Sequence, residues 1–323
     1  MRGLFFISNL RSQMVMEKKS VLFYRQFDRY SGGHQKVFDY FSHFCSTEDY
    51  EPAISFSNET LWDNSNPWFP RHTGVAFLPN DYDYLFLGGT DWEALSKYSL
   101  DPKKPVINLI QHVRHASPTS DVYPFLTNKA IRICVSPEVA SALEGLVTGP
   151  LLTISNGVSI PEFGTNKVND VFVAGFKNPL LAEKLTNHTS IISQTKHLSR
   201  GKFLRCLSEA RISVLLPHRT EGFFLPALEA MQLSDIVIVP DCIGNRSFCV
   251  DYEKHGGNCI IPKYDVPSIV KAIQVAKQLI ANKERLAVLK ENALRTVGKH
   301  SLAAEREKFL KLMKSIDELW NAY

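Results

Sequence analysis

Apolar positions in this chain follow two patterns. Short runs of apolar and β-branched residues are typical of strands buried on both faces of a sheet. Longer segments, in which apolar residues recur every three or four positions between charges, predict amphipathic helices. The predicted strands are 21–24, 82–87, 105–110, 131–135, 171–174, 191–193, 212–216 and 235–240. The predicted helices are 35–44, 91–98, one opened by Pro137, one opened by Pro179, 226–232, a long region from Val266, and 303–319. Because strands and helices alternate, the pattern predicts an α/β protein with parallel sheets.

The stretch 211–240, with the sequence RISVLLPHRTEGFFLPALEAMQLSDIVIVP, contains the clearest strand, loop, helix, strand unit. Such a unit is a βαβ crossover in a parallel sheet, and ligands of these sheets bind at the carboxyl ends of the strands. The loop 218–225 lies at that end and carries Glu221, and Glu229 follows eight residues later on the helix. Two carboxylates are therefore expected near the ligand edge of the sheet.

Spacing alone gives these glutamates two interpretations. In the first, Glu229 accepts hydrogen bonds from a ribose diol, while free N–H groups at the helix start, near Phe224 and Leu225, bind a diphosphate. In the second, both are ordinary solvated glutamates, and the first lies at a helix N-terminus where the helix dipole favours negative charge.

The composition is that of a soluble globular protein. The chain has 323 residues, 44% hydrophobic and 22% charged, which is enough for two domains with buried cores. The formal net charge of +4 suits an anionic substrate such as a nucleotide sugar, or peripheral association with an anionic membrane surface. It falls short of the basic footprint of a nucleic-acid-binding protein, so no nucleic-acid partner is expected.

The cysteines and the N-terminal segment bear on cellular location. The six cysteines form no C-x-x-C pair and no metal-like cluster with histidine, and scattered free thiols are typical of a reducing compartment. The apolar segment 4–7 is too short for the core of a signal peptide or for a membrane span. We therefore expect a cytoplasmic protein, at most attached to the inner face of the membrane.

Two further loops can contribute to a site. Gly32 and Gly33, between a predicted strand and a predicted helix, allow a tight turn and close approach of the backbone to a ligand. The strand 105–110 is followed by His112 and Arg114, which would open onto the ligand edge. The structural alternatives are a simple helix-entry turn for the glycines, and a hydrogen-bonded histidine beside a surface arginine for the second loop.

The segment 59–70 is rich in asparagine, proline and tryptophan and predicts a long loop. Its aromatic residues Trp62, Trp68 and Phe69 can stack on an acceptor sugar or anchor the loop to the core. We favour anchoring.

The segment EGFFLPALEAM resembles the Glu-x7-Glu signature of the GT-B glycosyltransferases, in particular the retaining enzymes of family 4. In that family the first glutamate approaches the donor sugar and the second holds the nucleotide ribose, so the resemblance gives these roles to Glu221 and Glu229. SGGHQKV at 31–37 and ISNGV at 154–158 are similar to two further elements of the family. Phe224 departs from the family pattern, since it stands where glycine is usual, and this would reshape the seat of the sugar.

The resemblance implies roles for residues of the first domain. Gly32 and Gly33 would face the cleft, with His34 near the acceptor. His112 would lie close to the donor sugar, because many family 4 enzymes place a histidine after the corresponding strand. Arg114 would bind a phosphate or an acidic acceptor.

The resemblance also implies roles in the second domain. Family 4 enzymes normally open this domain with a strand and a basic loop that grips the diphosphate, and the stretch between Val158 and the strand 171–174 leaves little room for such a loop. Lys177, at a strand end, is the first candidate for the missing cation, and Arg219 is the second. Thr195 and Lys196 would meet the nucleotide base.

Taken with the resemblance, the sequence predicts a GT-B fold of two Rossmann-like domains facing a central cleft. The boundaries are 1–158 for the acceptor domain, 159–302 for the donor domain, and 303–323 for a C-terminal helix that returns to the first domain. The expected activity is transfer of a sugar from a nucleoside diphosphate-sugar to a glycan or lipid-linked saccharide, with retention of configuration and without a metal cofactor. A non-catalytic nucleotide-sugar or glycan binding protein is the alternative, because the basic loop is missing and Phe224 replaces glycine. A sugar-nucleotide epimerase is a third reading.

Overall fold

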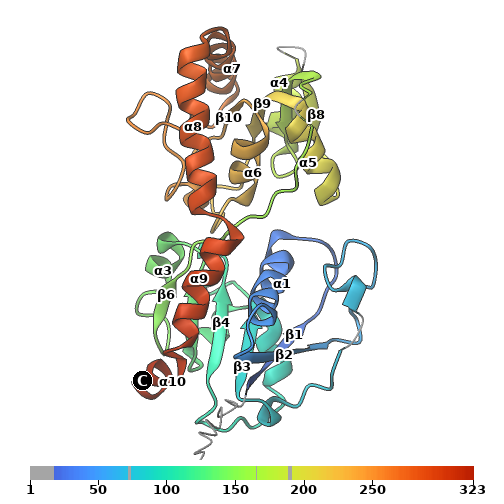
Figure 1. The fold of residues 1–323 in the computed structure, drawn as a ribbon, viewed down its shortest axis with the longest axis vertical. Helices are drawn as coiled ribbons and strands as arrows, with labels where there is room; N and C mark the ends of the chain where they lie inside the picture. The colour runs from blue at the N-terminus through green and yellow to red at the C-terminus, as the bar shows by residue number, and fades with distance from the viewer. Residues whose placement is uncertain (1–17, 72–73, 165, 188–190) are drawn as a thin grey trace, which may run out of the picture.

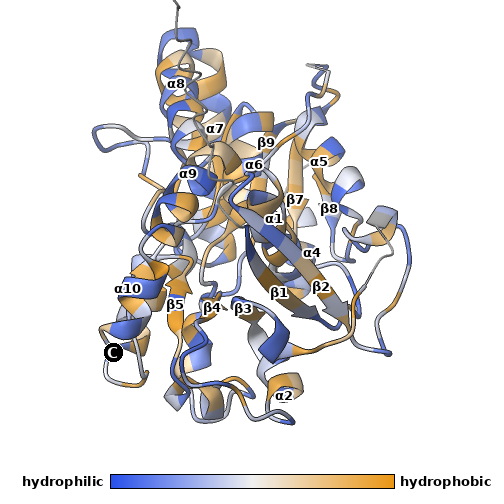
Figure 2. Cartoon of the chain, turned by 60° about the horizontal axis from the view of Figure 1, so that its bottom comes forward, coloured by the Kyte–Doolittle hydropathy of each residue, from blue (hydrophilic) through white to orange (hydrophobic). Residues whose placement is uncertain are grey.

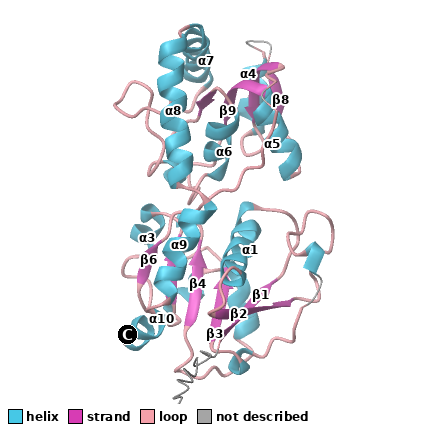
Figure 3. Cartoon of the chain, in the orientation of Figure 1, coloured by secondary structure: helices cyan, strands magenta, loops and turns pink. Residues whose placement is uncertain are grey.

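The computed structural model describes residues 18–71, 74–164, 166–187 and 191–323, so the apolar segment 4–7 lies outside the described residues. Two α/β halves are stacked along the long axis of the molecule (Figure 1). Each half contains one parallel sheet with helices packed against it (Figure 3). The predicted fold class is therefore confirmed.

The N-terminal half is built on a six-stranded parallel sheet in the order β2-β1-β3-β4-β5-β6. Its strands are β1 (Lys19–Arg25), β2 (Tyr50–Phe56), β3 (Tyr84–Gly88), β4 (Val106–Ile110), β5 (Ile131–Cys134) and β6 (Leu151–Thr153). Its helices are α1 (Gly32–Cys45), α2 (Trp92–Leu95) and α3 (Pro137–Leu143). Strands β3, β4 and β5 are buried along their whole length, as expected of continuous apolar runs inside a parallel sheet.

The C-terminal half is built on a four-stranded parallel sheet in the order β10-β9-β7-β8. Its strands are β7 (Asn169–Ala174), β8 (Ile192–Gln194), β9 (Ala210–Leu215) and β10 (Ile236–Ile238). Its helices are α4 (Pro179–Thr186), α5 (Arg200–Glu209), α6 (Leu225–Leu233), α7 (Val266–Ala281) and α8 (Lys283–Lys299). The connections β7-α4-β8 and β8-α5-β9 run in opposite directions across the sheet, which places α4 and α5 on opposite faces. The gap between β7 and β9 is therefore the switch point at which sheets of this kind bind ligands.

The chain passes between the two halves twice at one place. The Val158 N–H donates to the His300 carbonyl at 2.8 Å, and the Leu302 N–H donates to the Val158 carbonyl at 3.2 Å. Gly157 lies so close to Ser301 that a Cβ there would be 2.5 Å from the Ser301 carbonyl oxygen. Glycine is required for this close approach.

Beyond the crossing, α9 (Leu302–Met313) and α10 (Ile316–Asn321) pack on the N-terminal half, as the red helices in Figure 1 show. The ring of Phe309 lies 4.8 Å from that of Tyr40 and 4.9 Å from that of Phe44. Trp320 Nε1 donates to the Pro102 carbonyl at 3.2 Å. The end of the chain thus completes the core of its first half.

A buried ionic network fixes α9 to α1 at the crossing. Lys36 Nζ donates to Asp39 Oδ2 at 2.9 Å, to the Gly157 carbonyl at 3.1 Å and to Glu305 Oε1 at 2.8 Å. His43 Nε2 lies 2.8 Å from Glu305 Oε1, and the Gly157 N–H donates to Glu305 Oε2. The side chains of Lys36 and Glu305 are at most 1% exposed.

Several element boundaries differ from the prediction. The prediction of a single C-terminal helix over 303–319 is wrong, because a turn divides this segment. In that turn the Ser315 hydroxyl donates a hydrogen bond to the Leu312 carbonyl. The helical region from Val266 divides at Asn282, which caps α8. The helix 91–98 shortens to α2, and the edge strand β2 was not predicted, because its half-exposed sequence lacks a continuous apolar run.

The aromatic loop is anchored, as favoured above. Trp68 is fully buried, with its ring 5.2 Å from Phe38 and 5.8 Å from Phe56. Hydrophobic and hydrophilic stretches alternate along α8 and α9, as expected of helices with one buried face (Figure 2). Among the helices that the structure describes, none combines the length and the apolar character needed to cross a bilayer.

Candidate active site

Glu221 lies in the loop after β9, and its side chain is paired with a lysine from the neighbouring strand. Glu221 Oε1 accepts a hydrogen bond from Lys177 Nζ at 2.5 Å, and Glu221 as a residue is 6% exposed. Lys177 follows the end of β7 and lies 5.3 Å above the ring of Phe224. The two residues meet because β7 and β9 are adjacent and parallel, so that their carboxyl ends share one edge.

The same loop touches the N-terminal half. Glu221 and His112 form an antiparallel bridge, although they belong to different halves of the molecule. A Cβ on Gly222 would be 2.0 Å from the Gln111 carbonyl oxygen, so only glycine permits this contact. His112, which follows β4, is therefore held beside the glutamate of the motif.

His112 is neutral at physiological pH. Burial, together with the positive charges of Arg114 and Lys177, lowers the pKa of His112 to about 4. Its imidazole also hydrogen-bonds to the backbone of Thr220. A neutral imidazole can donate or accept a hydrogen bond but carries no charge to a ligand.

Glu229, on α6, is paired with an arginine that the sequence analysis missed. Glu229 is 3% exposed, and its Oε1 accepts a hydrogen bond from Arg200 Nη1 at the start of α5. Arg200 Nη2 donates to the Ser159 carbonyl at 3.0 Å, and Tyr30 of the N-terminal half hydrogen-bonds to Arg200. Burial raises the pKa of Glu229, and the charge of Arg200 opposes that rise. The second interpretation of the sequence, in which both glutamates are solvated, is thus contradicted for both residues.

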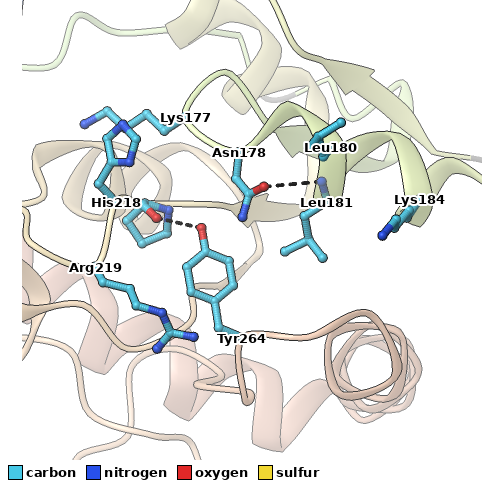
Figure 4. Close-up of a pocket in the computed structure, with 9 residues that line it drawn as sticks. Lys177, Asn178, Leu180, Leu181, Lys184, His218, Arg219 and Tyr264 are labelled. Atoms are coloured by element: carbon cyan, nitrogen blue, oxygen red, sulfur yellow. Dashed lines mark hydrogen bonds between the residues drawn. The ribbon is translucent and has the colours of Figure 1, made fainter.

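A basic cavity of about 320 Å³ opens at the switch point between β7 and β9 (Figure 4). No carboxylate lines it, and among the residues described neither Lys184 nor Arg219 forms an ion pair. The Arg219 guanidinium lies 5.0 Å from the ring centre of Tyr264, whose hydroxyl donates to the Pro217 carbonyl at 2.6 Å. The lining residues are Lys177, Asn178, Leu180, Leu181, Lys184, Pro217, His218, Arg219 and Tyr264. Lys177 joins this cavity to Glu221.

The glycine turn of the N-terminal half faces the second half. Ser31 caps α1, and a Cβ on Gly32 would lie 3.7 Å from Leu225 Cδ1 at the start of α6. Gly33 offers its carbonyl to Gln111 Nε2 at 3.2 Å. Gly32 and Gly33 thus lie where the two halves meet.

His34 and Arg114 do not come together. His34 Nε2 lies 3.2 Å from Asp28 Oδ1, and its Nδ1 lies 3.3 Å from Arg25 Nη2. Burial and Arg25 lower the pKa of His34 to about 4, and its side chain is 11% exposed. Arg114 is exposed on the turn after β4. His34 therefore offers little surface to an acceptor.

The N–H groups of Phe224 and Leu225 are not free, so this part of the prediction is wrong. The Phe224 N–H donates to the Gly244 carbonyl at 2.9 Å, and the Leu225 N–H donates to the Phe223 carbonyl at 3.2 Å. Phe224 itself is buried, and its ring supports Lys177. Cations rather than these amides are left to meet an anion.

Thr195 and Lys196 follow β8 at the same edge of the sheet. Gln194 Nε2 donates to the Lys196 carbonyl at 2.9 Å, which shapes this loop. In the described residues, no hydrogen bond or ion pair joins either side chain to the two motif glutamates. The described residues also contain no group of three or more His, Cys, Asp or Glu side chains placed to hold a metal ion.

Comparison with known proteins agrees with this geometry. Residues 168–296 match the model of the family described as glycosyl transferases group 1. A search of curated proteins finds no match.

Solved structures share the fold along nearly the whole chain. Sucrose-phosphate synthase from Thermosynechococcus elongatus is 12% identical, with a TM-score of 0.64 over 95% of this chain and 100% of that one. HepE from Anabaena, solved with UDP-glucose, is 11% identical, with a TM-score of 0.66 over 92% and 100%. A glycosyltransferase from Rickettsia africae is 11% identical, with a TM-score of 0.60 over 93% and 98%. Residues 168–296 thus match a group 1 glycosyl transferase domain, and the chain as a whole has the GT-B fold of these solved structures.

Proposed function

We propose that the protein transfers a sugar from a nucleoside diphosphate-sugar to a hydroxyl of a glycan or lipid-linked saccharide, with retention of configuration. The observation that carries the proposal is the position of Glu221. It lies against the backbone of His112 in one half and is paired with Lys177 at the rim of a basic cavity in the other. A ligand held there would contact both halves at once.

In this proposal the basic cavity receives the diphosphate. Lys184 and Arg219 bring two positive charges that form no ion pair with a carboxylate of the described residues, which matches the charge of a diphosphate bridging to a sugar. Lys177 is shared, since the diphosphate and Glu221 compete for it. The proposed diphosphate site therefore uses both Lys177 and Arg219, instead of only one of these two cations.

The chemistry would be mainly electrostatic. The bond between the anomeric carbon and the diphosphate oxygen breaks, the acceptor oxygen bonds to that carbon, and the acceptor proton leaves with the diphosphate. Cations fixed around the departing diphosphate stabilise the charge that develops on it. Glu221 orients the donor sugar, neutral His112 hydrogen-bonds to it, and no metal is invoked.

Uridine donors are the first to test, because the HepE structures hold UDP and UDP-glucose and the Staphylococcus aureus TarM structure holds UDP. A lipid-linked acceptor would bring the protein to a membrane surface as a peripheral protein. Thr195 and Lys196, beside β8, remain the proposed contacts of the base, and the turn Gly32–Gly33 the proposed wall of the acceptor side.

The experiment measures sugar release and transfer from a panel of nucleotide sugars. Glu221→Gln should lower kcat roughly 100-fold, because the sugar loses an ionised partner in the transition state. Arg219→Ala and Lys184→Ala should instead weaken binding of inorganic pyrophosphate and raise KM. Glu307→Gln and Lys202→Ala, at exposed positions, serve as matched controls. Tight nucleotide-sugar binding without turnover on any acceptor would favour the non-catalytic alternative.

A further inference from the structure

Arg200, the first residue of α5, touches three parts of the molecule. Its Nη1 is paired with Glu229 on α6, and its Nη2 donates to the Ser159 carbonyl in the connection between the halves. Tyr30, in the loop between β1 and α1, hydrogen-bonds to it from the N-terminal half. The roles proposed above do not include this arginine.

Glu229 needs a positive partner to stay charged. A carboxyl group that is 3% exposed loses most of its hydration, and burial alone raises its pKa. The groups that face it are Arg200 from α5 and Tyr30 from the N-terminal half. Lys290 of α8 also packs on α6, but it donates to the Met231 carbonyl, beyond Glu229. Arg200 is therefore the cation that acts on this carboxylate.

The geometry leaves room for a ligand beside the ion pair. Arg200 engages Glu229 Oε1, and no protein hydrogen bond in the described residues engages Oε2. The Arg200 side chain is 29% exposed, so the pair lies at the edge of solvent. A charged carboxylate accepts hydrogen bonds from both hydroxyls of a diol, whereas a protonated one must itself donate from one oxygen.

We propose that Arg200 is a positioning residue that keeps the Glu229 carboxylate charged and turned toward the ribose of the nucleotide. The proposal rests on the proposed function, because it takes Glu229 as the ribose-binding group. Through Ser159 and Tyr30, Arg200 also makes the orientation of that carboxylate depend on the contact between the two halves.

The test compares Arg200→Met, Arg200→Lys and wild type by titration calorimetry across mildly acidic to mildly alkaline pH. The probes are UDP, 2′,3′-dideoxy-UDP and inorganic pyrophosphate. Arg200→Met should bind UDP at least about tenfold more weakly near neutral pH, and should regain affinity as pH rises and Glu229 ionises. Its affinity for dideoxy-UDP and pyrophosphate should not change, and Arg200→Lys should recover most of the loss. Arg205→Met, exposed on the same helix, is the control.

Two results would overturn the inference. If Arg200→Met bound UDP as tightly as wild type, or more tightly, Arg200 would occupy the ribose site itself and would not prepare Glu229 to bind the ribose. Equal, pH-independent losses for UDP and pyrophosphate would mean that the pair only holds the helices together. In both cases, UDP binding by wild type leaves the proposed function standing. Failure of the wild type to bind any nucleoside diphosphate would instead remove the proposed function and this inference with it.

Discussion

Gly222 decides where the motif glutamate lies. Its missing Cβ lets the loop after β9 press against the Gln111 carbonyl, which places Glu221 beside His112. The spacing of the two glutamates indicates their chemistry, but this contact with the other half gives Glu221 its position. The departure at Phe224 needs no glycine-like backbone, because the φ angle of Phe224 is −92°.

Gly222→Ala should therefore separate the halves locally. The new methyl group meets backbone rather than a flexible side chain, so we expect a loss of about 1–3 kcal/mol of unfolding free energy. The loss of activity should be larger than the loss of stability alone explains, because Glu221 moves with the loop. Gly298→Ala on α8, where nothing lies within 4 Å, is the matched control and should be neutral or slightly stabilising. Equal behaviour of the two variants in thermal melts and assays would contradict this account.

At the scale of elements, α9 fixes the C-terminal end of the chain to α1. Its hydrophobic side brings Phe309 into the first core, and its Glu305 completes the network of Lys36, His43 and Gly157. The pKa of Glu305 is lowered, first by the charge of Lys36 acting against burial, then by hydrogen bonds from His43 and Gly157. The helix thus contributes charge as well as apolar surface.

Glu305→Gln should cost about 3 kcal/mol of unfolding free energy, because it removes one of the two carboxylates that pair with the buried Lys36 ammonium. The folded pKa of Glu305 lies below its usual 4.5, so its stabilisation is fully present above that pH. As pH falls through the folded pKa, the stabilisation is lost, and the difference between wild type and variant should shrink. Denaturant melts at a series of pH values measure this, with Glu307→Gln on the exposed side of α9 as control. A gap that stayed constant into acid would count against it.

At the scale of the whole molecule, the first half contains residues from both ends of the described chain. All four tryptophans, Trp62, Trp68, Trp92 and Trp320, lie in the N-terminal half or in α10 packed against it. Tryptophan fluorescence therefore reports the unfolding of this half, while circular dichroism reports both.

Phe309→Ala should lower the fluorescence midpoint, since loss of a fully buried phenylalanine costs about 3–5 kcal/mol. Ile269→Ala, at a buried position of α7 in the core of the C-terminal half, should mainly affect the transition seen by circular dichroism. If both variants shifted the two signals together, the halves would form one cooperative unit, and the expectation of separate responses would be wrong.

The pattern of apolar runs was sufficient to place most strands, because central strands such as β3, β4 and β5 are buried along their whole length and their apolar runs can be recognised without knowing their neighbours. Turn and cap residues such as Ser136 and Pro179 also act locally, and both helices start where they indicate. The sequence pattern did not predict the edge strand β2 or the break before α10, since both depend on neighbours distant in sequence.

The sequence by itself determined the α/β class and the two acidic residues of the motif, because these follow from local periodicity and short spacing. Lys177 was a candidate through the family resemblance, and its pairing with Glu221 follows from the adjacency of β7 and β9. Only the tertiary structure decided that Glu221 lies against His112, that Glu229 is paired with Arg200, which Tyr30 also contacts, and that the amides of Phe224 and Leu225 are occupied. The reason is physical: burial, pairing and pKa depend on which distant segments pack together, and a pattern along one chain carries no record of those distances.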